Sequence, residues 1–97
     1  MQSVELRLLP MIRFTIEQRH LTDDHGKPMA PPPAAFHTCE AENVNEALRL
    51  FVKKRPGAEI IGDVLTFPGF QAVATVRKAS GVYTLQFTPA SQRDWKL

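Results

Sequence analysis

NVNEALRLFVKKRPG, residues 43–57, has the pattern of a single amphipathic helix. Its apolar residues follow the i, i+3, i+4, i+7, i+8 spacing that places side chains on one side of a helix. They are Val44, Ala47, Leu48, Phe51 and Val52. Asn43 is a good N-cap, Glu46 lies three positions later as in a capping box, and Pro56-Gly57 ends the helix. We therefore expect one helix that buries its apolar side against another layer.

Segments with the period-two alternation of β-strands lie on both sides of this helix. Before it, apolar residues occupy even positions across residues 4–16, with Pro10 as an edge or a bend, and residues 35–41 can form a second strand. After it come strands at 58–67, 70–78 and 82–88, separated by turns at Pro68-Gly69 and Ala79-Ser80-Gly81. The order β-β-α-β-β-β predicts an α+β fold: an antiparallel sheet of four to five strands with one amphipathic helix packed on one face. The expected core includes Phe14, Ile16, Leu48, Phe51, Val64, Val76 and Leu85.

The rest of the chain is expected to connect or extend this frame as a single domain over residues 1–97. Residues 1–10 are a candidate accessory N-terminal arm, and residues 90–97 form a C-terminal tail. Residues 20–34 contain Pro31-Pro32-Pro33, which favours an extended polyproline path and cannot join a central strand. This segment is therefore expected to be a long and mobile Pro-rich loop.

Composition excludes several classes of protein. The chain has 97 residues, of which 43% are hydrophobic, and a net charge of +2. It is too hydrophobic for global disorder, and it is not an acidic mimic of DNA. Cys39 is the only cysteine, so no internal disulfide can form. We find no apolar stretch long enough to span a membrane and no signal-peptide pattern, so we expect a cytoplasmic protein without membrane association.

No residue pattern predicts catalysis, a cofactor or a metal site. His37 and Cys39 share one strand face, as a base and a nucleophile would, but no third group that could orient them is visible. We interpret both as packing residues. The loop residues His20, Asp23, Asp24 and His25 do not match a zinc-binding spacing, and the glycines form no phosphate-binding loop. We therefore expect a protein that is not an enzyme.

Three basic clusters leave room for nucleic-acid binding. They are Lys53-Lys54-Arg55, Arg77-Lys78, and Arg19-His20 with Lys27. The first lies in the last turn of the helix, where the dipole favours cations, and the second lies at a hairpin end. If the clusters converge, they would form a surface for phosphate contacts. Phe70, Tyr83 and Phe87 are candidates for base stacking, although we favour a place in the core for them.

The sequence best fits a small interaction module that binds another macromolecule, most simply a protein. A sheet of this kind has edges, and an exposed edge can add a strand from a partner or from a second copy, giving a homodimer. Trp95 is either a clamp for the tail or an interface anchor. The alternative is a nucleic-acid-binding module that uses the basic clusters. A salt-dependent shift with DNA or RNA would distinguish the two.

Overall fold

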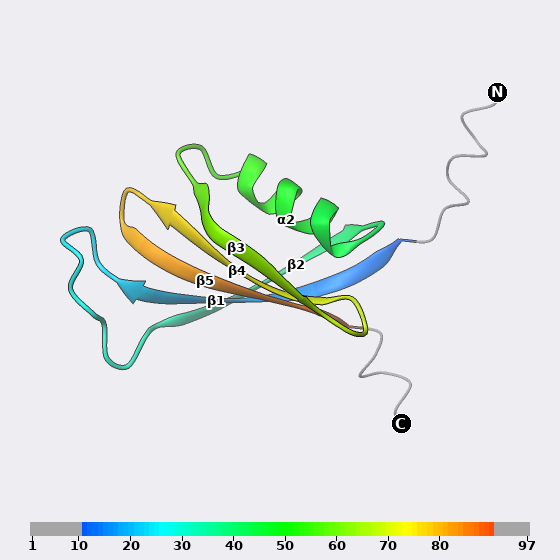
Figure 1. Ribbon diagram of the computed structural model, residues 1–97, viewed down its shortest axis with the longest axis horizontal. Helices are drawn as coiled ribbons and strands as arrows, with labels where there is room; N and C mark the ends of the chain where they lie inside the picture. The colour runs from blue at the N-terminus through cyan, green and yellow to red at the C-terminus, as the bar shows by residue number, and fades with distance from the viewer. Residues whose placement is uncertain (1–10, 91–97) are drawn as a thin grey trace.

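The computed structural model describes residues 11–90, which form a five-stranded antiparallel sheet and one helix (Figure 1). The predicted α+β fold and its order are confirmed. The strands pair in the order β2-β1-β5-β4-β3, so β2 and β3 are the two edges. The elements are β1 Ile12–Thr22, β2 Ala34–Ala41, α2 Val44–Lys53, β3 Glu59–Phe67, β4 Gln71–Lys78 and β5 Gly81–Pro89.

Helix α2 begins as its sequence predicts. The Asn43 side chain accepts a hydrogen bond from the backbone N–H of Glu46 at 2.8 Å, which satisfies one of the free donors of the first turn. The Glu46 carboxylate accepts from the backbone N–H of Glu42 at 2.7 Å, one residue earlier than a standard capping box requires. These bonds fix the entry to the helix directly after β2.

One face of the sheet is covered by α2, and the core lies between these two layers (Figure 1). The even-numbered residues of β1 and β4 and the odd-numbered residues of β5 point into it, as alternation along a strand requires. Phe14, Ile16 and Phe87 are fully buried. Every predicted core residue belongs to this cluster, with Val64 only partly buried at its margin.

The connection between β1 and β2 forms more strand pairing and hydrogen bonds than the sequence suggests. Strand β1 continues through Thr22, and the Asp23 carboxylate then accepts backbone N–H bonds from His25 at 2.9 Å and Lys27 at 2.8 Å. The chain returns antiparallel, with the Met29 N–H donating to the Leu21 carbonyl at 2.8 Å. Residues 20–22 therefore belong to the sheet, and the expected loop over residues 20–34 is shorter than predicted.

Two backbone features depend on glycine. In β3, the three residues between Ile61 and Leu65 lie opposite the single residue Ala74 of β4, and Gly62 adopts φ +72° within this bulge. At the start of β5, Gly81 lies so close to β1 that an added Cβ would be 1.9 Å from the Thr22 carbonyl oxygen. The sequence predicts a hairpin loop with a positive φ at its glycine, and the φ of +134° at Gly81 confirms it. The close approach to Thr22, which also excludes a side chain at Gly81, was not predicted.

Candidate interaction surface

The face of the sheet opposite α2 is uncovered within the described residues (Figure 1). Strand registers align its side chains in rows across all five strands. One row runs Phe36, Glu17, Gln86, Val73, Leu65. Beside it, Thr38, Thr15 and Thr88 are aligned on β2, β1 and β5, and Gln71 and Phe67 are aligned on β4 and β3. We call this the open face. Its middle is mainly Thr and Gln. On its margins, Phe36 of β2 lies beside the polar Thr38 and Glu40, whereas Leu65 and Phe67 of β3 are both apolar.

The charges on the open face are arranged as pairs. Three arginines contribute to it, and each forms a salt bridge with a glutamate of the same face. The pairs are Arg13 with Glu40 at 3.3 Å, Arg19 with Glu17, and Arg77 with Glu59 at 2.8 Å. Two of the pairs join neighbouring strands, β1 to β2 and β4 to β3. The open face therefore carries no net charge from its arginines and glutamates.

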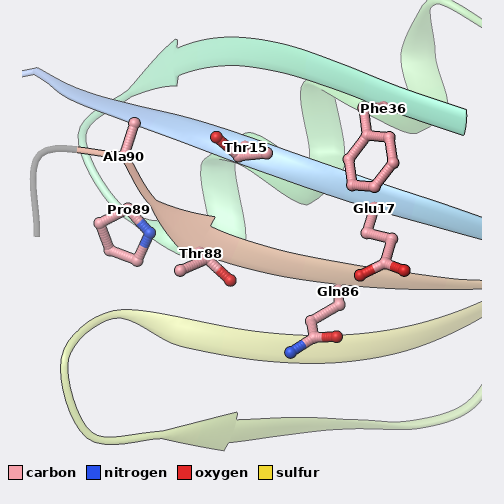
Figure 2. A pocket seen from close by; sticks show the side chains of 7 residues that line it. All are labelled: Thr15, Glu17, Phe36, Gln86, Thr88, Pro89 and Ala90. Atoms are coloured by element: carbon pink, nitrogen blue, oxygen red, sulfur yellow. The ribbon is translucent and has the colours of Figure 1, made fainter. Parts of the chain in front are cut away.

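A shallow hollow of about 120 Å³ lies on the open face (Figure 2). Phe36 of β2 stands at one side, Glu17 of β1 and Gln86 of β5 lie beside it, and Thr15 and Thr88 line the rest. The Phe36 side chain is 66% exposed, which is unusual for a phenylalanine and leaves most of its ring in contact with water.

A larger group of exposed apolar side chains gathers on β3 and on the turn that follows it. Leu65 and Phe67 are about half exposed and lie on the open face, while Phe70 follows in the turn with φ +62°. Ile60 is also exposed, but it lies on the helix side of β3. Exposed apolar side chains that share one strand face, as Leu65 and Phe67 do, mark sites of association on a protein surface.

The predicted basic cluster at the end of α2 is divided by the helix. Successive helical residues point about 100° apart, so neighbours in sequence face different directions. Lys53 lines an apolar groove between α2 and β3, together with Leu48 and Ile60. Lys54 and Arg55 line a different groove, between α2 and β2. The three cations therefore form no single surface.

The other predicted cations are also separate. Arg77 is paired with Glu59 on the open face, and Lys78 places its ammonium 4.4 Å from the centre of the Tyr83 ring on the helix side. Tyr83 also stacks on His20, with ring centres 4.1 Å apart. Arg77 and Lys78 thus lie on opposite sides of the sheet. The basic clusters meet only in part among residues 11–90: Lys78 and His20 both contact Tyr83, and Lys78 and Arg55 both act on the charge of His37.

His37 and Cys39 lie under the helix, on the side of β2 that faces the core. The His37 ring packs edge-on against Phe51 with centres 5.4 Å apart, and Cys39 packs against the core cluster. Burial lowers the pKa of His37, and the charges of Arg55 and Lys78 lower it further. Burial raises the pKa of the Cys39 thiol, which keeps the sulfur protonated and a weak nucleophile. This geometry supports the packing interpretation.

The loop residues, the aromatic candidates for base stacking and Trp95 are the remaining predicted sites. Asp23 is used in the turn after β1, and no cluster of three or more metal-ligating side chains occurs in residues 11–90. Tyr83 and Phe87 are buried, whereas Phe70 is exposed. Trp95 lies outside the described residues. Within the described part of the chain, no helix is long and apolar enough to cross a membrane.

Sequence reasoning missed Phe36, Leu65 and Phe67 as surface residues. Alternation along each strand gives two faces, but it does not say which face the helix covers. The available signal was that the partners of Phe36 in its alternation, Thr38 and Glu40, are polar. Leu65 and Phe67 lie beyond a bulge that breaks the simple alternation of β3.

Comparison with protein-family models, with curated proteins and with solved structures gave no match.

Proposed function

We propose that this protein is a non-enzymatic interaction module that binds another protein through the open face and its β3 margin. The observation that carries the proposal is the exposed apolar group of Leu65, Phe67 and Phe70 beside a sheet face whose charges are already paired. Interfaces between proteins combine apolar centres enriched in aromatic residues with a polar surround, and charged residues are depleted at those centres.

The same observation favours protein over nucleic acid as the partner. Nucleic-acid binding depends on cations that neutralise phosphates, and such cations must be free to contact them. On the open face, the arginines are engaged by Glu17, Glu40 and Glu59. The cations at the end of α2 face two different grooves. The alternative of a nucleic-acid-binding module therefore has weaker support.

The proposal is tested by placing charge on the apolar margin. In the double variant Leu65→Asp/Phe67→Asp, two half-exposed side chains become acidic, which should abolish association without unfolding the chain. His25→Asp is the control, because His25 is exposed in the turn after β1 and belongs to neither margin. Tagged forms of each would be used to capture partners from the native cell.

The expected result is a protein that is captured by the parent chain and by His25→Asp but is lost with the double variant. Equal capture by all three forms would contradict the proposal. A parallel titration of fluorescent DNA and RNA at low and high salt addresses the alternative. Tight binding of nucleic acid that is unchanged in the double variant would favour that alternative instead.

A further inference from the structure

A second surface lies at the opposite edge of the sheet. Strand β2 and the C-terminal half of α2 enclose a groove of about 490 Å³, lined on the helix side by Leu50, Phe51, Lys54 and Arg55. Strand β2 contributes residues 36–40 to the groove, and Thr15 and Ile16 of β1 also line it. The outer side of β2 pairs with no other strand of residues 11–90, so a segment added at this edge would lie beside the groove and the end of the helix.

The β2 edge is regular, unlike the β3 edge. All eight residues of β2 pair with β1 without a shift of register, so the outward backbone groups also repeat regularly. The β3 edge contains the bulge at residues 62–64 and carries Asp63, features that obstruct the addition of a strand. Of the two edges, β2 is therefore the one suited to pair with an extended segment.

The groove contains two cations, Lys54 and Arg55, that form no salt bridge within residues 11–90. Glu40, the one carboxylate lining the groove, is bonded to Arg13 at 3.3 Å. Charges removed from water are normally paired, and Arg55 is partly buried. The groove is thus complementary to an anionic ligand.

The guanidinium of Arg55 is held in position. It lies 3.5 Å from the centre of the Phe51 ring and donates to the Phe51 carbonyl at 3.1 Å. A second nitrogen is 3.5 Å from His37 Nδ1. An arginine fixed in this way loses little conformational freedom when a carboxylate binds, and its planar fork matches a carboxylate in two places.

The two cations are spaced like residues on one face of a strand. A guanidinium nitrogen of Arg55 lies 3.5 Å from His37 Nδ1, and Lys54 lines the same groove as Cys39, two positions further along β2. Residues i and i+2 of a strand share a face, at a separation of roughly 6.8 Å for a rise of about 3.4 Å per residue. A strand paired with β2 would meet both cations if it carried carboxylates at alternate positions.

We propose that the groove between β2 and α2 binds an extended segment of a partner protein that pairs with β2 and has acidic side chains at positions i and i+2. This inference rests on the proposed function of protein binding and names a site and a ligand chemistry for it. A second copy of β2 is the less suitable occupant, because two paired copies would bring Lys54 and Arg55 of each copy toward one another.

The test uses two short capped peptides of alternating Val and Thr, one with Glu at two successive positions on one face and one with Gln there. Each is titrated into the isotopically labelled protein, and the backbone amide signals are followed by NMR. We expect the Glu peptide to shift the amides of β2. Binding should weaken by about tenfold or more with the Gln peptide, because hydrogen bonds to charged groups are the stronger ones.

Variants of the protein identify the cations responsible. Arg55→Gln and Lys54→Gln should each weaken binding of the Glu peptide, and Lys53→Gln, in the other groove, should leave it unchanged. Arg55→Lys keeps the charge but not the fork and should give an intermediate loss. If Arg55→Gln lowers the melting temperature strongly, the Lys54→Gln variant tests the inference instead, because Lys54 is exposed and its replacement should not unfold the protein.

Three results would overturn the inference: equal binding of the Glu and Gln peptides, no shift at β2, or no effect of either Lys54→Gln or Arg55→Gln. A dimer in sedimentation that is lost with Thr38→Pro would show that a second copy occupies the edge, and would also overturn it. The double variant Leu65→Asp/Phe67→Asp should bind the Glu peptide normally. Failure at this groove is therefore distinguishable from failure of the open face.

Discussion

The two faces of the sheet are built from the same strands but have opposite surroundings. On the covered face, Phe14, Ile16 and Phe87 are fully buried beneath α2. On the open face, Leu65 and Phe67 remain about half exposed among threonines, glutamines and paired charges. The covered face supplies the free energy of folding, since burial of apolar area is the main stabilising contribution. The open face is consequently free to vary in composition, and its exposed apolar side chains need an explanation outside the fold.

The largest expected effect compares the same substitution on the two faces. Leu85→Ala on the covered face, where the side chain is 1% exposed, should lower the free energy of unfolding by about 2–5 kcal/mol. Leu65→Ala on the open face, where the side chain is 55% exposed, should change it by no more than about 0.5 kcal/mol. Chemical denaturation of both variants measures the difference. Similar losses in the two variants would show that the open face also belongs to the core.

A smaller loss of stability is expected at Gly81, where the structure leaves no room for a side chain. Gly81→Ala would place a Cβ 1.9 Å from the Thr22 carbonyl oxygen, at a φ of +134° that residues with side chains rarely adopt. Strand β5 would have to shift away from β1, with a loss of about 1–3 kcal/mol, the range for a strained backbone position. Gly26→Ala is the control, since nothing lies within 4 Å of its added Cβ, although its φ is also positive. If thermal unfolding shows equal losses for the two, the close approach at Gly81 has no energetic role.

The smallest expected effect is a dependence of stability on pH from the covered face. Burial, then Arg55 and Lys78, lower the pKa of His37 from its ordinary value of 6.5. The unfolded chain therefore binds a proton more readily, so the contribution is fully present above pH 6.5 and is lost as the pH falls through the lower folded value. Stability should decrease between about pH 7 and pH 5, and less steeply in His37→Asn. Identical slopes for the two proteins would contradict this assignment.

The sequence could predict the elements because each has a local cause. The helix follows from the apolar spacing after Asn43, and the predicted core follows from alternation within each strand. The sequence did not predict that β1 continues to Thr22, because His20 lies on the covered face of the sheet although it is not apolar. There it stacks on Tyr83 and its Nε2 lies 3.0 Å from the Ser80 carbonyl oxygen, partners that are distant in sequence.

The interaction surfaces were less predictable because they depend on strand order. Phe36 and Leu65 are at opposite ends of one row of the open face. They lie there because the strand order places β2 and β3 at opposite edges of the sheet. Lys53 and Lys54 are adjacent in sequence, yet they line different grooves on the two sides of α2. The positions of charges along the sequence do not predict this separation, because it depends on where the helix packs on the sheet.

The central claim, that the open face binds a protein, is tested most directly by site-specific photo-crosslinking in the native cell. A photoreactive amino acid is placed at Phe67 and, as the control, at His25 in the turn after β1. We expect a discrete crosslinked protein from position 67 and none from position 25. Equal crosslinking from both positions, or adducts from position 67 that nuclease removes, would contradict it.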